Sequence, residues 1–237
     1  MKLSKEGYAK YQTAFEINVT QLQKTKGVIA VLIGGSFNRG DLQIGSDLDF
    51  IVLTDSNSKS HNEKYHETNG ILVEVLEIPY EYAVEKIKGD RKKQRRYLSG
   101  IIAASKTVYG NKRKAESLIK KALSTYTAPV PTFTKKERED LLFFLGKSPQ
   151  KEQQLRIKNK PFAAQLRINH KLATCLEIAF CLEGKVIPHH KYWDSELKTF
   201  TDKKMARLLR RAALAIDTKQ REDEWAKLVI YTIQRLK

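Results

Sequence analysis

The stretch GGSFNRGDLQIGSDLDFIV, residues 34–52, combines a glycine turn with two aspartates that stand two residues apart. Apolar runs flank its polar middle, because residues 28–33 (VIAVLI) precede it and residues 50–53 close it. Short apolar runs bounded by polar and turn residues are typical of buried strands. The stretch therefore predicts a strand, a short helix at about residues 36–41, and a second strand at residues 48–54.

Asp47 and Asp49 lie two positions apart, so in an extended strand both carboxylates project from one face while Leu48 faces the other. Carboxylates at this spacing repel each other unless a cation lies between them. Mg²⁺ prefers oxygen ligands, usually one or two carboxylates together with the phosphates of a substrate. We therefore interpret the aspartate pair as a candidate Mg²⁺ site.

The Gly-Gly-Ser turn adds groups that can bind an anion. Gly34 and Gly35 allow the backbone to approach a ligand closely. Ser36 stands where the short helix would begin, so its hydroxyl and the nearby backbone N–H groups are available to a phosphate. One segment thus offers phosphate donors beside metal ligands, which is what phosphoryl or nucleotidyl transfer requires.

A third strand, predicted at residues 70–79 (GILVEVLEIP), supplies a third carboxylate. Glu74 and Glu77 are three residues apart and so face opposite sides of a regular strand. Glu74 lies between Val73 and Val75, and a charged residue within an apolar run usually needs a partner or a metal. We choose Glu74 as the third ligand and expect Glu77, near the strand end, to be solvated.

These residues together resemble the signature of the DNA polymerase β-type nucleotidyltransferase superfamily: Gly-Ser, then Asp-x-Asp, on a strand–helix–strand unit, with an acidic residue on a following strand. The resemblance covers residues 28–78. The layout of the chain also resembles the small two-domain members, such as the aminoglycoside and lincosamide nucleotidyltransferases, with weaker support from the patch VIPHHKYW at residues 186–193.

The resemblance implies an α+β fold, in which a nucleotidyltransferase-type mixed β-sheet flanked by helices is followed by an all-α helical bundle. It implies that the nucleotide lies in a cleft between the two domains. Gly34, Gly35 and Ser36 would bind the nucleotide through its β- and γ-phosphates, and Arg39 would lie near those phosphates.

The resemblance also implies that Asp47, Asp49 and Glu74 are the catalytic residues and that they bind two Mg²⁺ ions, with Mn²⁺ as an alternative. Glu74 would in addition accept the proton of the attacking hydroxyl. Two ions about 3.5–4 Å apart clamp the attacking and leaving oxygens of an in-line displacement. An NMP would pass from an NTP, with ATP as the expected donor, to a hydroxyl acceptor, and pyrophosphate would be released.

The segment APVPTFT, residues 128–134, contains two prolines and is the best candidate for a domain boundary. We therefore expect a catalytic domain at residues 1–127 and a C-terminal helical bundle at residues 135–237. Before the boundary, helices are predicted at residues 5–25, 80–87, 91–104 and 111–126, and residues 55–69 are interpreted as a polar loop. Beyond it, helices are predicted at residues 135–145, 162–182, 202–216 and 221–236.

The net charge of +17 attracts polyanions, although a merely soluble, lysine-rich protein would show it as well. We expect a small, antibiotic-like acceptor, but a polycationic aminoglycoside would be repelled unless its cleft were locally acidic. RNA, tRNA or a protein is the alternative acceptor, and a non-catalytic, antitoxin-like nucleotide-binding module is a third hypothesis. The basic run RKKQRR, residues 91–96, is interpreted as a solvated helix end, with contacts to RNA or triphosphate as the alternative.

The residues His189–Trp193 either line the cleft and stack on a base or cap the helical bundle. Cys175 and Cys181 are expected to be reduced, small apolar residues on one helix. No apolar run approaches the ~20 residues that a membrane span needs, and the first residues lack the apolar core of a signal peptide. No membrane partner is therefore expected, and a cytoplasmic location is the default expectation.

Overall fold

A computed structural model describes residues 3–237, and the chain divides into two compact units. The first unit ends at Ala128 and the second is Pro129–Lys237. Each unit has hydrophobic clusters of its own, so each is described by itself. Among the residues described, no helix has the length and the apolar composition that crossing a bilayer requires.

The first unit is built around a mixed sheet. Its described strands pair in the order β3-β4-β2-β1-β5, with β2 and β4 parallel and the other neighbours antiparallel. Its elements in chain order are α1 (Lys5–Leu22), β1 (Val28–Ile33), α2 (Gly35–Arg39), β2 (Leu48–Thr54), β3 (Asn62–Thr68), β4 (Ile71–Pro79), α3 (Tyr80–Asp90), α4 (Tyr97–Ala103), β5 (Lys106–Gly110) and α5 (Lys112–Tyr126). This sheet, together with the helical second unit, confirms the expected α+β fold class.

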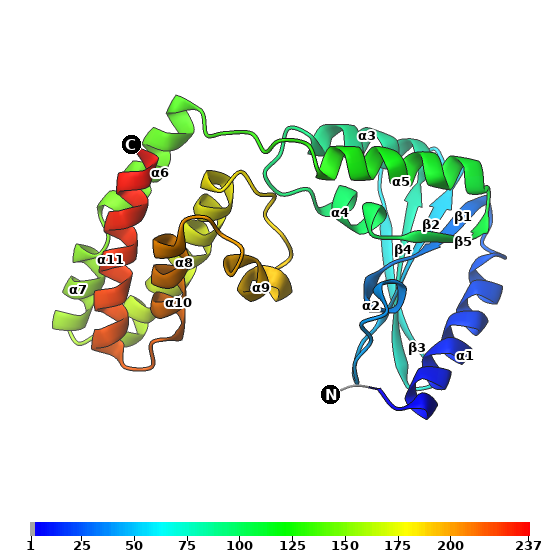
Figure 1. Cartoon of the computed structure of the whole chain (residues 1–237), viewed down its shortest axis with the longest axis horizontal. Helices are drawn as coiled ribbons and strands as arrows, with labels where there is room; N and C mark the ends of the chain where they lie inside the picture. Colours follow the sequence, from blue (N-terminus) through cyan, green and yellow to red (C-terminus); the bar gives the residue numbers. More distant parts are fainter. Residues whose placement is uncertain (1–2) are drawn as a thin grey trace. The chain divides into compact units, whose positions relative to one another are not determined.

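Helices cover both faces of the sheet (Figure 1). Along β2, Ile51 and Leu53 belong to the cluster formed with α3, α4 and α5, whereas Phe50 and Val52 belong to the cluster formed with α1. Burying one such side chain contributes about 1.5–3 kcal/mol, and a shift of one residue would move the whole set to the wrong face. The alternation therefore fixes the register of β2, and with it the face on which Asp49 lies.

The structure corrects the interpretation of residues 55–69 as a loop, because β3 occupies Asn62–Thr68. This strand is almost wholly exposed, so it lacks the apolar pattern by which a strand is usually recognised. Asn69 and Gly70 have φ angles of 53° and 74°, the left-handed conformations of a tight two-residue hairpin. The Asn-Gly turn and pairing with β4 therefore produce this edge strand.

The predicted helix at residues 91–104 is also wrong in its first half. Helix α3 ends at Asp90, residues 91–96 form a connection, and α4 begins at Tyr97. The strand β5, which pairs with the outer edge of β1, was missed because its five residues (KTVYG) are mostly exposed. Short edge strands of this kind carry little hydrophobic signal.

Arg96 shows that the basic run at residues 91–96 is not simply a solvated helix end. Its side chain is fully buried, and Nη1 donates hydrogen bonds to the carbonyl oxygens of Thr125 at 2.7 Å and Ala128 at 2.5 Å. Nη1 also donates to Tyr126 O at 3.1 Å, so one guanidinium group contacts three carbonyls at the C-terminal end of α5. Arg91, Lys92 and Lys93 remain exposed. Through Arg96, the connection between α3 and α4 is therefore held against the end of α5.

The second unit is helical, and its core surrounds the fully buried Trp225 and Phe180. Its elements are α6 (Lys135–Gly146), α7 (Gln150–Ile157), α8 (Pro161–Leu182), the short η1 (His190–Tyr192), α9 (Trp193–Leu197), α10 (Lys203–Leu214) and α11 (Thr218–Leu236). The helices predicted at residues 135–145 and 162–182 agree with α6 and α8 to within about one residue. Helix α7 and the two short helices were not predicted.

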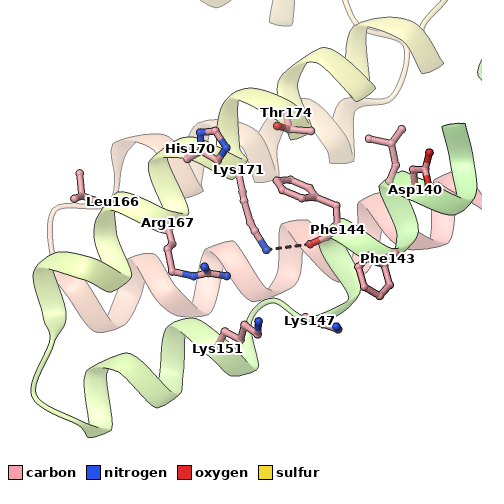
Figure 2. Close-up of a pocket in the computed structure, with 11 residues that line it drawn as sticks. Asp140, Phe143, Phe144, Lys147, Lys151, Leu166, Arg167, His170, Lys171 and Thr174 are labelled. Atoms are coloured by element: carbon pink, nitrogen blue, oxygen red, sulfur yellow. Dashed lines mark hydrogen bonds between the residues drawn. The ribbon is translucent and has the colours of Figure 1, made fainter.

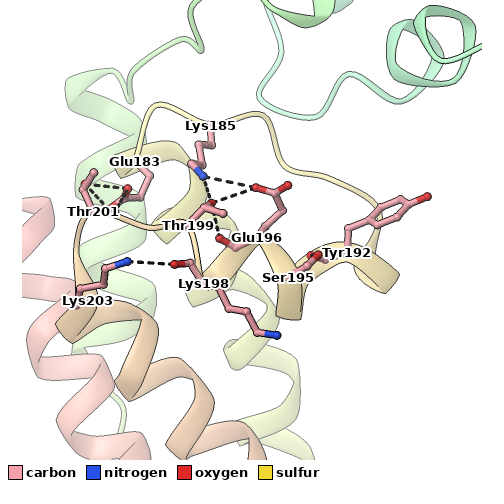
Figure 3. Close-up of polar contacts among 9 residues, drawn as sticks. All are labelled: Glu183, Lys185, Tyr192, Ser195, Glu196, Lys198, Thr199, Thr201 and Lys203. Atoms are coloured by element: carbon pink, nitrogen blue, oxygen red, sulfur yellow. Dashed lines mark hydrogen bonds and ion pairs between the residues drawn. The ribbon is translucent and has the colours of Figure 1, made fainter. Parts of the chain in front are cut away.

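The segment between α8 and α10 is held by polar contacts (Figure 3). Glu183 accepts hydrogen bonds from the backbone N–H groups of Thr201 at 2.7 Å and Asp202 at 2.8 Å. Lys185 lies 3.5 Å from Glu196 within the same segment. Trp193 packs against the core and donates its Nε1–H to Pro188 O at 3.1 Å. The patch at residues 186–193 thus closes one side of the helical core.

Candidate active site

The parallel pairing of β2 and β4 places Asp49 directly beside Glu74. Asp47 stands immediately before β2, and the three carboxylates offer ligand oxygens that all lie within 4.8 Å of one another. All three residues are partly exposed, so the group is accessible from solvent. The structure thus brings together the three carboxylates that the sequence selected.

Asp49 and Glu74 lie on the sheet face that α3, α4 and α5 cover farther along the strands. Two residues after Asp49, Ile51 is buried in that cluster, and two residues after Glu74, Leu76 is buried there as well. Successive residues of one parity share a face, so the carboxylates continue the buried rows of β2 and β4. The site is therefore the solvent-accessible end of a rigid apolar surface.

Glycine is required at position 35 for two independent reasons. Its φ angle is +61°, a conformation that residues with a Cβ rarely adopt, and a Cβ built there would overlap Asp49 Oδ2. Gly34 in turn donates its N–H to the Asp49 carbonyl at 2.8 Å. The glycine turn is thus packed directly against the central carboxylate.

Ser36 lies in the first turn of α2 and directly follows Gly35, the glycine that packs against Asp49. Its Oγ is buried and has no hydrogen-bond partner among the residues that the structure describes. A buried hydroxyl without a partner costs free energy, and a bound group that accepted or donated a hydrogen bond there would recover it. The first turn of a helix also leaves backbone N–H groups without intrahelical acceptors.

This set of donors fits a hard divalent cation together with a phosphate. Three carboxylates within 4.8 Å supply the oxygen ligands that Mg²⁺ prefers and the negative charge that a cation would neutralise. The Ser36 hydroxyl and the glycine turn supply donors on the other side of Asp49. The acidic group can therefore hold a metal, with an anion beside it.

Arg39 occupies the last turn of α2, where its Nε lies 3.3 Å from Asp41 Oδ2. Its side chain is about one-third exposed. The structure places it on the same short helix as Ser36, but no phosphate contact follows from the pairing with Asp41. Its role near the phosphates stays a prediction.

Two tyrosines that the sequence analysis did not select lie close to the carboxylates. Tyr65 pairs with Glu74 across the β3–β4 hairpin, and its hydroxyl is 3.4 Å from Glu74 Oε1 and 3.3 Å from Glu63 Oε2. The charge of Glu74, followed by burial and the charge of Glu63, raises the pKa of Tyr65. Burial raises the pKa of Tyr97, and the charges of Glu74, Glu63 and Asp49 raise it further. Both phenols therefore stay protonated at neutral pH, and that of Tyr65 can donate a hydrogen bond to Glu74.

A third tyrosine supports the site from α1. The hydroxyl of Tyr11 donates a hydrogen bond to Ser46 O at 2.6 Å, immediately before Asp47. Burial and the charge of Asp47 raise the pKa of Tyr11, against a smaller opposing effect of the Ser46 hydrogen bond. Tyr11 therefore fixes the end of the polar loop from which Asp47 projects.

Comparison with known proteins supports this assignment of the first unit. Residues 18–103 match the family model described as the nucleotidyltransferase domain, and that segment contains the glycine turn and all three carboxylates. A comparison with curated proteins found no match.

Two solved structures are similar to this chain at low sequence identity. A nucleotidyltransferase-like protein from Exiguobacterium sibiricum 255-15 is 13% identical, with 94% of this chain and 74% of that chain covered at a TM-score of 0.51, which shows a shared fold. A spectinomycin adenyltransferase from Enterococcus faecialis, solved with ATP and spectinomycin, is 14% identical over 97% of this chain and 98% of that chain, at a TM-score of 0.35. The segment that carries the glycine turn and the three carboxylates, residues 18–103, is thus the part of this chain that is similar to the nucleotidyltransferase domain family.

Proposed function

We propose that this protein transfers an NMP from an NTP, with ATP as the donor, to the hydroxyl group of an acceptor. The observation that carries the proposal is the convergence of Asp47, Asp49 and Glu74 within 4.8 Å, beside a glycine turn packed on Asp49. We assign catalysis to a domain at residues 1–127 and treat residues 135–237 as a separate helical domain.

In this proposal Asp47, Asp49 and Glu74 hold Mg²⁺, which when bound neutralises the phosphates and polarises the oxygens at the reacting phosphorus. Glu74 accepts the proton of the acceptor hydroxyl. The acceptor oxygen then forms a bond to the α-phosphorus, the bond from that phosphorus to the bridging oxygen of the β-phosphate breaks, and pyrophosphate leaves. The Tyr65 hydroxyl, 3.4 Å from Glu74, orients the carboxylate for this role.

The glycine turn binds the phosphates of the nucleotide in the same proposal. Gly34 and Gly35 allow the backbone to approach the phosphates, and Ser36 contributes the buried hydroxyl that has no partner among the described residues. Arg39 neutralises phosphate charge from the end of the same short helix. Holding the phosphates beside the carboxylates aligns the α-phosphorus with the acceptor, and such positioning is a major part of phosphoryl-transfer catalysis.

A small hydroxyl compound of the antibiotic type is the acceptor that we propose first. The net charge of +17 favours a second candidate, an RNA or another polyanion, because such a field attracts phosphate backbones. A non-catalytic nucleotide-binding module explains the site less well, since binding alone does not require three carboxylates to be held together against their repulsion.

The test is transfer of label from each α-³²P-labelled NTP in a cell extract containing Mg²⁺, with products separated by size. We expect labelled product from the unmodified protein and none from the Asp47→Asn/Asp49→Asn variant. A second pair of variants on one strand sharpens the test: Glu74→Gln should abolish transfer, whereas Glu77→Gln, which lies in a salt bridge with Lys64 at 2.6 Å, should retain it.

The size of the product separates the two acceptor classes. Label in a small compound supports the antibiotic-type acceptor, and label in RNA-sized or protein-sized material supports the macromolecular one. Absence of label above the double-aspartate control, in extracts from several sources and with every NTP, would refute the transferase proposal and favour the binding module.

A further inference from the structure

The second unit contains a pocket between α6, α7 and α8 (Figure 2). Its volume is about 970 Å³, at the upper end of the range of roughly 300–1,000 Å³ that small-molecule sites occupy. Apolar side chains form much of its wall, among them Phe143, Phe144 and Leu166, and Phe143 is 68% exposed. The pocket therefore exposes apolar surface to solvent, and a ligand with an apolar body would bury that surface.

The charged groups of this pocket are nearly all of one sign. Lys147, Lys151, Arg167 and Lys171 line it, whereas Asp140 is the one acidic residue among its described lining. Like charges gathered around a concave apolar surface create a positive potential, which low-dielectric walls strengthen. The pocket is therefore complementary to an anion.

Arg167 presents donors that the protein itself does not use. Its Nε donates to Glu152 Oε1 at 3.1 Å, which fixes the guanidinium plane. Within the part of the chain that the structure describes, its terminal amino groups have no hydrogen-bond partner. A guanidinium held in this way offers a rigid pair of donors that suits a carboxylate, sulfonate or phosphate.

Lys171 lies on the inner side of the same pocket. The residue is only 5% exposed, and its Nζ donates to Phe144 O at 3.0 Å (Figure 2). The same Nζ donates to the Ser148 hydroxyl. Burial lowers the pKa of Lys171, Glu152 opposes that shift, and the charges of Arg167 and Lys151 add to it. An anion in the pocket would relieve the repulsion among these cations.

We propose that this pocket binds a small organic anion with an aromatic or otherwise apolar body. The charged group would lie against Arg167, Lys147 and Lys151, and the body would lie against Phe143 and Phe144. All the residues of this site belong to the second unit, and the proposal does not depend on nucleotidyl transfer. Its ligand class follows from the combination of cations with aromatic walls.

The test compares two fluorescent probes of the same shape: the sulfonate 8-anilinonaphthalene-1-sulfonate and its uncharged analogue N-phenyl-1-naphthylamine. We expect the unmodified protein to bind the sulfonate more tightly, with an affinity that falls as salt is added. Lys147→Gln/Lys151→Gln should weaken sulfonate binding roughly tenfold, equivalent to about 1.4 kcal/mol, and change binding of the uncharged probe less than about twofold. Both lysines are exposed, so the variant should fold normally.

Matched controls keep the result specific. Lys158→Gln/Lys219→Gln removes two exposed lysines of the same unit outside the pocket and should leave sulfonate affinity unchanged. Phe143→Ser should weaken both probes, because it removes apolar wall and no charge. Asp47→Asn should bind both probes normally, so failure of the transferase proposal would not be mistaken for failure of this one.

Three outcomes would overturn the inference. The first is equal binding of the charged and uncharged probes, and the second is equal loss of affinity in the two double-lysine variants. The third is tight binding of an acidic amphipathic peptide together with weak binding of the sulfonate, which would assign the pocket to a protein partner.

Discussion

The candidate site of the first unit and the core of the second unit arrange their carboxylates in opposite ways. In the second unit, carboxylates of low exposure lie against cations: Glu152 is 3.1 Å from Arg167, and Glu222 is 2.7 Å from Arg156. In the first unit, Asp47, Asp49 and Glu74 are gathered within 4.8 Å of one another. These carboxylates of the helical unit each lie beside a cation, whereas the candidate site gathers three carboxylates at one place. Elsewhere in the sheet unit carboxylates are paired as well, for example Glu77 with Lys64 at 2.6 Å.

This difference separates stability from function. Pairing a buried carboxylate prevents a loss of several kcal/mol, so the pairs of the second unit are what folding alone would favour. Three carboxylates side by side repel one another and do not help the sheet to fold. A cation bound among them, as the proposed function requires, would offset that repulsion.

The largest effect is expected from Asp47→Asn. It should lower nucleotidyl transfer by about 10³-fold or more, because removing a metal-binding charge at the reacting phosphate typically costs about 4 kcal/mol of transition-state stabilisation. Without metal, its free energy of unfolding should be unchanged or higher by up to about 1 kcal/mol, because one like charge has been removed. The measurements are the labelled-NTP assay and thermal unfolding in EDTA.

A metal titration supplies the control for this prediction. Mg²⁺ should raise the unfolding temperature of the unmodified protein and of Glu67→Gln, an exposed change on β3, but not of Asp47→Asn. If Asp47→Asn lost stability in EDTA and still responded to Mg²⁺, Asp47 would be a structural residue and the contrast between the units would fail.

The second prediction concerns Arg96, a buried charge of the first unit that lies outside the carboxylate site. Arg96, in the same unit, is fully buried but donates to backbone carbonyls, so it behaves like the paired charges of the second unit. Arg96→Met should destabilise the protein by about 3 kcal/mol, because it removes a buried donor that bonds to three carbonyls at the end of α5. Urea unfolding would measure this loss.

The exposed Lys92 gives the matched control for Arg96. Lys92→Met should change stability by no more than about 0.5 kcal/mol. Equal effects of the two substitutions would show that the basic run is solvated as the sequence suggested. Unfolding curves with different slopes for Arg96→Met would instead point to a change in the unfolded state.

The sequence predicts the carboxylates because their signal is local. Asp47 and Asp49 share a face through strand periodicity alone, and Glu74 stands out as a charge between Val73 and Val75. Their mutual placement depends on the parallel pairing of β2 with β4, which no local pattern specifies. The family resemblance implied a mixed sheet and Glu74 as the third ligand, and the structure adds the parallel pairing that sets Asp49 beside Glu74 in register.

Tyr65 was missed because its strand carries no apolar pattern, although a signal for it was present. Asn69-Gly70 is a hairpin dipeptide, and counting back from it pairs Thr68 with Ile71 and Tyr65 with Glu74. Recognition of the turn would therefore have placed the phenol beside the carboxylate. Tyr97 had no comparable signal, since it reaches the site through the packing of α4 on the sheet.

The third prediction tests the pairing in the second unit. Glu152 is 1% exposed, so Arg167→Gln removes the cation beside a buried carboxylate. We expect a loss of about 2 kcal/mol, less than the 3–5 kcal/mol of a fully buried pair, because Arg167 is itself 38% exposed and partly screened. Urea unfolding of Arg167→Gln, Glu152→Gln and the double variant would give the coupling between the two residues.

Arg207→Gln, an exposed change on α10, is the control for this cycle. It should leave stability within about 0.5 kcal/mol of the unmodified protein. Additive losses in the double variant would mean that Glu152 and Arg167 do not depend on each other, and the contrast between paired and concentrated carboxylates would then lose its best example.

The smallest expected effect is a loss of stability at high pH that comes from the two thiols of α8. These thiols are groups that the second unit keeps uncharged. Burial raises the pKa of Cys175 and of Cys181 from 9.0 to about 12. Raised folded pKa values mean that stability is fully present below pH 9 and is lost as pH rises toward 12, because the unfolded chain ionises first. At pH 10 each thiol should account for a loss of about 1.4 kcal/mol relative to neutral pH.

The Cys175→Ala/Cys181→Ala variant isolates this contribution. It should be less stable than the unmodified protein at pH 7.5, since it creates cavities in the core, but it should lose less stability between pH 7.5 and pH 10. Lysines and tyrosines titrate equally in both proteins, so the difference between the two losses belongs to the thiols. Equal losses of stability in the two proteins would show that the thiols ionise as readily in the folded state as in the unfolded chain. The core of the second unit would then accept ionised thiols.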